Sequence, residues 1–142
     1  MPTFSPIVTA EFIDAAEAAI AYVRNSDDPQ VAYAAANVPI FIMPFPNSAQ
    51  AHAGGCPSCT YLGLWANKWE GYAPSTHGII WLYEDGIRSK AHGDLINQTI
   101  KTLEHEIDHA LQRDHVLAAM RSKGLLGEAP TGASPCACEP DY

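Results

Sequence analysis

Positive charge, long apolar runs and repeated segments are all scarce in this sequence. The 142 residues include 8 Lys or Arg against 16 Asp or Glu, which gives a formal net charge of −8. The few cationic residues are scattered and form no basic stripe, whereas nucleic acids and anionic membranes bind basic faces. No apolar run approaches the ~18 residues of a membrane span. We therefore expect neither a nucleic acid nor a membrane as the partner of this chain.

The apolar residues that are present predict one domain that begins with helices. A hydrophobic content of 47% over 142 residues predicts a single domain, residues 1–142, with a core of its own. Helical spacing predicts a first helix from about Ala10 to Arg24, with Thr9 as its N-cap. A short second helix is expected after Asp28, which caps it, with Pro29 in its first turn.

Two short apolar runs, rich in β-branched and aromatic residues, predict strands at residues 37–45 and 76–84. The two prolines in the first run place it at a sheet edge or limit its paired length. The turn pair Asp85–Gly86 is expected to end the second strand. Residues 46–75 are rich in Gly, Pro, Ser and Asn, which predicts a long, partly structured excursion.

The longest predicted helix follows Asp94, its expected N-cap, and carries one apolar stripe. The stripe comprises Ile96, Ile100, Leu103, Ile107 and Leu111. At about 100° per residue, His105 and His109 lie on the opposite side of this helix. We therefore expect both histidines to face a cleft or solvent.

His105, Glu106 and His109 spell the pattern H-E-x-x-H. Histidines four residues apart on a helix emerge from one face, one above the other. Two such imidazoles can bind one Zn²⁺, while the intervening carboxylate reaches a water on the open side of the metal. The alternative is a solvated helix face that carries these residues by chance. The position of the motif within a helix, on its non-core face, favours the metal site.

Residues 105–115 resemble the zinc-binding signature of the zincin metallopeptidases, in its metzincin form H-E-x-x-H-x-x-G-x-x-H. The resemblance implies that one catalytic zinc is bound by three histidines, His105, His109 and His115. It also implies that Glu106 is the general base that deprotonates a zinc-activated water.

The same resemblance implies a strand before the active-site helix, whose edge pairs with an extended substrate. Ile79–Tyr83 is the matching stretch. The predicted fold is therefore α+β: a small zincin-like domain with an N-terminal helix, a short mixed sheet, the long active-site helix and an irregular C-terminal tail.

The third zinc ligand is the point at which the sequence departs from the family pattern. The family's glycine is Gln112 here, and no Met-turn is recognisable. If the helix continued past Gln112, His115 would point away from the other two histidines. Glu128 is then the competing ligand, in the manner of the gluzincins, with Asp114 as the third choice. A bend at Gln112 costs on the order of 1 kcal/mol, which metal binding offsets, so His115 is preferred.

The four cysteines form two closely spaced pairs, Cys56 with Cys59 and Cys136 with Cys138. This spacing fits a second, structural zinc site with four thiolates, or two disulfides in an oxidising compartment. A thioredoxin-like redox motif lacks the surrounding βαβ pattern, and four reduced thiols are the remaining alternative. Disulfides are slightly favoured, because zincins often act outside the cytosol.

Several further residues are candidates without a preferred assignment. A group that stabilises the developing negative charge usually completes such a site, and the candidates are His77, His92, Tyr72 and Tyr83. Carboxylates that orient the ligand imidazoles are also expected, and Glu104 and Asp108 are near in sequence. Trp65, Trp69 and Trp81 either line a substrate groove or, as is more common for large aromatics, belong to the core.

These observations predict a zinc-dependent endopeptidase whose partner is a protein or peptide substrate. The alternatives are a non-catalytic zinc-binding interaction module and a metal-dependent amidohydrolase that acts on a non-peptide substrate. Residues 1–6 lack the charged and apolar regions of a signal peptide. The prediction fits a secreted or periplasmic protease, or an effector or toxin domain that is delivered outside the producing cell.

Overall fold

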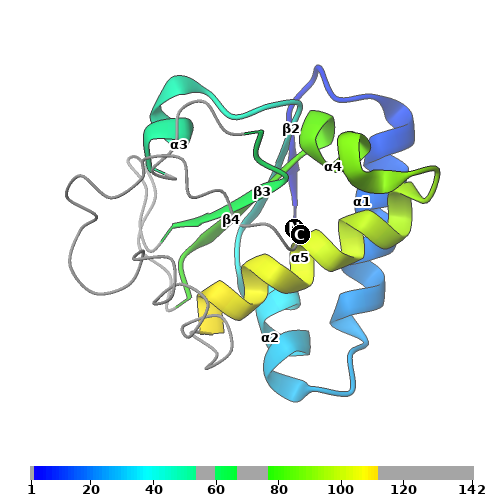
Figure 1. The fold of residues 1–142 in the computed structure, drawn as a ribbon. Coiled ribbons are helices and arrows are strands. Elements are labelled where there is room, and N and C mark those ends of the chain that lie inside the picture. The colour runs from blue at the N-terminus through cyan, green and yellow to red at the C-terminus, as the bar shows by residue number, and fades with distance from the viewer. Residues whose placement is uncertain (1, 54–59, 67–76, 112–142) are drawn as a thin grey trace.

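The computed structural model describes residues 2–53, 60–66 and 77–111 of the chain. Within these residues helices and strands alternate irregularly (Figure 1). The elements are β1 (Thr3–Phe4), α1 (Ala10–Arg24), α2 (Pro29–Asn37), β2 (Ile40–Met43), α3 (Ser48–Ala53), β3 (Gly63–Ala66), β4 (Ile79–Tyr83), α4 (Glu84–Ala91) and α5 (Leu95–Leu111). The α+β class and the mixed sheet are confirmed, whereas the expected C-terminal tail lies outside the described residues.

The described strands form one sheet in the order β1-β2-β4-β3. The β1–β2 and β2–β4 pairs are parallel, and β3 pairs with β4 antiparallel. The expectation that Ile79–Tyr83 offers a free edge is wrong, because β4 is hydrogen-bonded on both sides. In the described sheet the edge strand next to β4 is β3. It lies within residues 46–75, the stretch expected to be a partly structured excursion.

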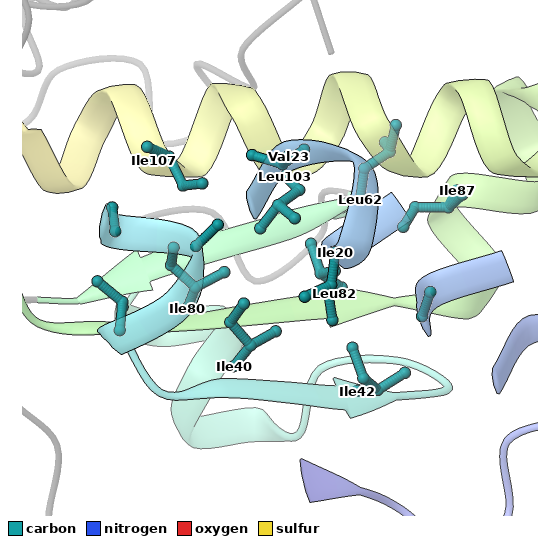
Figure 2. Close-up of a cluster of buried hydrophobic side chains, with 14 of the residues drawn as sticks. Ile20, Val23, Ile40, Ile42, Leu62, Ile80, Leu82, Ile87, Leu103 and Ile107 are labelled. Carbon is teal, nitrogen blue, oxygen red and sulfur yellow. The ribbon is translucent and has the colours of Figure 1, made fainter. Parts of the chain in front are cut away.

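Helices cover one face of the sheet and enclose the main core (Figure 2). Leu103 and Ile107 of α5 point toward the sheet, where Ile80 and Leu82 of β4 meet them. Ile20 of α1 joins the same cluster. The opposite face carries a smaller cluster made by Leu64, Ile79, Trp81 and Tyr83. Because α5 is anchored by these buried side chains, the residues on its flank have fixed positions relative to β3 and β4.

The first two helices begin where the sequence predicts. The Thr9 hydroxyl accepts a hydrogen bond from the Phe12 backbone N–H at 3.2 Å, which caps α1. The Asp28 carboxylate accepts from the Gln30 N–H at 2.9 Å and caps α2. Both predictions are confirmed, and in each case the side chain satisfies a backbone donor that has no partner within the helix.

The end of the second strand differs from the prediction. Asp85–Gly86 does not form a turn, because α4 begins directly at Glu84 and contains both residues. Gly86 lies against the carbonyl of Tyr61, where a Cβ would clash. Tight packing therefore explains the glycine, and the local turn signal was misleading.

The first predicted strand has a shorter paired length than expected. β2 covers Ile40–Met43, inside the predicted 37–45, and it lies between β1 and β4. The two prolines were interpreted as marking either a limited paired length or an edge position; the limited length is therefore right and the edge position is wrong.

Among the described helices, none is long and apolar enough to cross a membrane.

Candidate metal and catalytic site

The predicted active-site helix is α5, and its N-terminus is fixed by a cap. The Asp94 carboxylate accepts from the Asn97 N–H at 2.9 Å, as predicted. Just before this cap, His92 and Gly93 have φ angles of 47° and 92°, which reverse the chain between α4 and α5. α5 then passes over β3 and β4 (Figure 1). This path carries the H-E-x-x-H residues to the β3 end of the sheet.

His105 and His109 meet on the surface of α5. Their Nε2 atoms are 3.2 Å apart, and the ring centroids are separated by 4.8 Å at an interplanar angle of 78°. Two nitrogens at Zn–N distances of ~2.0–2.1 Å in a tetrahedral site lie about 3.3 Å from each other. A hydrogen bond between the two imidazoles has a similar length, so the distance fits a shared metal ion without requiring one.

Glu106 lies between α5 and β3. Its side chain is 1% exposed, and its Cγ and Oε2 lie directly above Gly63 on the strand. Burial of a carboxylate is costly unless the fold or a bound group compensates it. A deeply placed acid beside paired imidazoles is the arrangement that a metal-assisted hydrolase needs.

Comparisons with protein-family models, with curated proteins and with solved structures gave no match for this chain. The residues of the chain itself therefore carry the assignment of the site. Those residues are the histidine pair, Glu106 and the strand on which Glu106 rests.

The site is more buried than the sequence predicts. His109 is 9% exposed and His105 is half-buried, so of the two expected surroundings, a cleft or solvent, solvent is wrong for His109. The reason is that α5 packs along two sides. One side carries the apolar stripe, and the adjacent side buries the polar residues Gln98, Thr99, Thr102, Glu106 and His109. Ile96, expected in the stripe, is instead 46% exposed near the start of the helix.

Tyr83, one of the candidates for completing the site, belongs to the smaller cluster on the sheet face opposite α5. Tyr83 is fully buried, and its hydroxyl donates to Gln50 Oε1 at 2.8 Å. Burial raises the pKa of Tyr83 well above its ordinary value, and the negative charges of Glu106 and Tyr61 raise it further. Tyr83 therefore remains a neutral hydrogen-bond donor at any physiological pH. The Gln50 amide, which receives this bond, in turn donates to the sulfur of Met43 at 3.4 Å.

The other candidates for completing the site have different surroundings. The His77 ring packs edge-on against Tyr33, with centroids 6.2 Å apart. The carbonyl of His77 accepts from the Trp65 indole N–H at 2.7 Å. His92 is exposed at the turn before α5, and Tyr72 lies outside the described residues.

The two carboxylates proposed to orient the imidazoles lie on the same helix, one turn apart. Glu104 is exposed and Asp108 is half-buried. Partial burial raises the pKa of Glu104, and the nearby Asp108 carboxylate raises it further. Carboxylates four residues apart on a helix are neighbours on its surface, and like charges at this spacing are unfavourable.

The tryptophans in the described residues differ in how deeply they are buried. Trp81 is 3% exposed and stacks on Phe41, with ring centroids 6.1 Å apart. It is a core residue, which was the more common of the two alternatives. Trp65 is half-buried on β3, and Trp69 lies outside the described residues.

The candidates for a third metal ligand lie outside the described residues. Within residues 2–53, 60–66 and 77–111, no three side chains of His, Cys, Asp or Glu converge on one point. His115, Asp114 and Glu128 all fall outside these ranges, as do Cys56, Cys59, Cys136 and Cys138. The described site therefore consists of two imidazoles and one carboxylate, and sequence reasoning had missed only the strand beneath them.

Proposed function

We propose that this chain is a zinc-dependent endopeptidase with its active site on α5. The observation that carries the proposal is the 3.2 Å separation of the His105 and His109 Nε2 atoms next to the buried Glu106. Both the order of these residues and their spacing fit the chemistry of a hydrolytic zinc site.

In this proposal His105 and His109 hold the ion together with a third residue, for which His115 is preferred over Glu128. A zinc ion bound there supplies Lewis-acid chemistry, which makes water more acidic and a peptide carbonyl more electrophilic. Glu106 accepts the proton of the attacking water and passes it to the leaving amine as the C–N bond breaks. The same carboxylate thus serves as base and then as acid, and it returns to its initial state.

The burial of Glu106 favours catalysis over a purely structural role for the metal. A structural zinc is closed by four protein ligands, and it gains nothing from a carboxylate held beside the ligands at a desolvation cost. The paired cysteines fit an oxidising compartment, and a secreted, periplasmic or delivered protease is part of the proposal.

The experiment combines metal analysis with cleavage of a mixed peptide library by the full chain. The wild-type protein should contain one catalytic zinc and cleave peptides. Glu106→Gln keeps the volume of the side chain but removes the base, so it should abolish cleavage with the zinc content unchanged. Glu17→Gln, an exposed acid on α1, is the matched control and should alter neither quantity.

Three other outcomes would contradict the proposal in different ways. Cleavage that persists in Glu106→Gln would exclude Glu106 as the base. Stoichiometric zinc without any hydrolysis would support the non-catalytic zinc-binding module. Hydrolysis of small non-peptide amides, with peptides left intact, would support the amidohydrolase. Thiol counting with and without a chelator separates cysteines in disulfides from cysteines that bind a second zinc.

A further inference from the structure

Gly63, the first residue of β3, leaves the space that the Glu106 side chain fills. A Cβ at Gly63 would stand 2.9 Å from Glu106 Oε2 and 3.0 Å from Glu106 Cγ. It would also stand 3.0 Å from the Thr102 methyl carbon. Carbon atoms in favourable contact are about 3.5–4.0 Å apart, so any side chain at position 63 displaces its neighbours.

The sheet register explains why position 63 faces α5. Gly63 is directly opposite Leu82 in the antiparallel β3–β4 pair, and directly opposed residues point to the same face of a sheet. Leu82 belongs to the core cluster that also contains Leu103 and Ile107 of α5. Thr102 and Glu106 are neighbours on α5, one turn apart, and both meet the bare backbone of Gly63.

The backbone of Gly63 does not itself require glycine. Among the described glycines, positive φ angles occur at Gly78 and Gly93, and Gly63 is not one of them. A glycine inside a strand weakens the strand, and it often marks a place where another part of the structure approaches closely. At position 63 the approaching group is the acid of the H-E-x-x-H motif.

We propose that Gly63 is a positioning residue for Glu106. The absence of a side chain at position 63 lets the Glu106 carboxylate lie against β3 and thereby fixes its position on α5. This inference rests on the proposed role of Glu106 as the base. It assigns a function to a residue that lies outside the motif and on a different element.

The first test is Gly63→Ala in the full-length chain, assayed on the peptide library and by zinc titration. The added methyl group pushes the carboxylate away from the strand, and a misplacement of about 1 Å can cost a reaction roughly 100-fold. We expect kcat to fall by about that factor. KM and the zinc dissociation constant should stay within about twofold of wild type, because the atoms nearest to an added Cβ belong to Glu106 and Thr102 and not to the histidine pair.

Two control variants separate positioning from general damage. Ile42→Val shortens a fully buried side chain of β2 and should lower the melting temperature without lowering kcat. The double variant Gly63→Ala/Thr102→Ser removes the Thr102 methyl group and keeps its hydroxyl, which accepts from Gln98 at 3.4 Å. If the obstacle is Glu106, the double variant should remain as slow as Gly63→Ala.

The second test is independent of catalysis. Gly63→Ala should lower the melting temperature of the wild-type chain by a few degrees, roughly 3–5 °C. A Glu106→Ala background removes two of the three close contacts of an added Cβ and leaves that with the Thr102 methyl carbon, so the same substitution should lower the melting temperature by less than half as much. Such non-additivity is the signature of two residues in direct contact.

The two tests fail in distinguishable ways. A wild-type chain that cleaves no peptide overturns the proposed function, and the melting-temperature cycle still decides whether Gly63 and Glu106 are coupled. Equal losses in both backgrounds overturn the inference, as does a Gly63→Ala variant with unchanged kcat. Recovery of kcat in Gly63→Ala/Thr102→Ser also overturns it, because the methyl group of Thr102 would then be the obstacle.

Discussion

The carboxylate of Glu84 binds Thr9 at two atoms and so joins the start of α4 to the start of α1. Glu84 Oε1 accepts from the Thr9 backbone N–H at 3.0 Å, and Oε2 accepts from the Thr9 hydroxyl at 2.7 Å. Arg88 donates to the same Oε2 at 2.6 Å. Since Glu84 is 4% exposed, these bonds compensate a charge that is largely removed from water.

This network predicts a loss of stability in acid. Burial alone would raise the pKa of Glu84, but hydrogen bonds from Thr9 and Arg88 lower it below its ordinary value of 4.5. A carboxyl group with a lowered folded-state pKa contributes stability above its unfolded-state pKa, and this contribution is lost as the pH falls through the folded-state pKa. We expect the free energy of unfolding, measured in urea, to decline below pH 4.5, and to decline less in Glu84→Gln.

Removal of the Glu84 carboxylate should destabilise the fold at neutral pH. Glu84→Ala removes the charged acceptor that the Thr9 N–H, the Thr9 hydroxyl and Arg88 share, and a hydrogen bond to a charged group contributes about 1.5–3 kcal/mol. Urea unfolding at pH 7 measures this loss. Glu11 also pairs with Arg88, at 2.7 Å, but its side chain is 72% exposed. Glu11→Gln should therefore change stability by less than about 0.5 kcal/mol, and an equal effect of both substitutions would contradict this account.

The turn before α5 offers a stabilising substitution. His92 has a φ of 47°, in the left-handed region that non-glycine residues adopt at a cost of roughly 1–2 kcal/mol. His92→Gly should stabilise the chain by about 0.5–1 kcal/mol, because glycine adopts this conformation freely. Gly93→Ala places a side chain at a φ of 92° and should have the opposite sign. Chemical denaturation of both variants checks the prediction, which fails if His92→Gly is destabilising.

Tyr83 should resist ionisation. Its pKa is raised by burial, and then by the charges of Glu106 and Tyr61. In an alkaline titration followed by phenolate absorbance, Tyr83→Phe should therefore show the same amplitude as wild type near pH 10, where an ordinary tyrosine ionises. A reduced amplitude in the variant would show that Tyr83 ionises normally and that its surroundings are wetter than described.

Local signals in the sequence predicted the parts of the fold that depend on neighbours in the chain. Thr9 and Asp28 cap α1 and α2 because each side chain meets a backbone N–H two or three residues later. Asp94 acts in the same way for α5. The His105–His109 pair was also predictable, since helix geometry alone brings residues four apart together.

The features that depend on distant contacts were not predictable. In the sequence Gly63 is one of four glycines in the stretch 46–75, and its role becomes visible only from its contact with Glu106 on α5. The turn pair Asp85–Gly86 suggested that no helix begins at Glu84. The hydrogen bonds from Thr9 to the Glu84 side chain join residues 75 positions apart, so no local signal could predict them. Burial of His109 likewise depends on how α5 crosses the sheet, which periodicity alone does not determine.

A zinc titration of the full chain by calorimetry, after metal removal by a chelator, tests the central claim most directly. We predict a saturable site that includes His105 and His109, and retention of this site in Glu106→Gln. His105→Ala or His109→Ala should weaken binding by more than the roughly 10–100-fold that loss of an outer partner costs. Zinc binding that is absent from the wild-type chain, or unchanged in both histidine variants, would contradict the account.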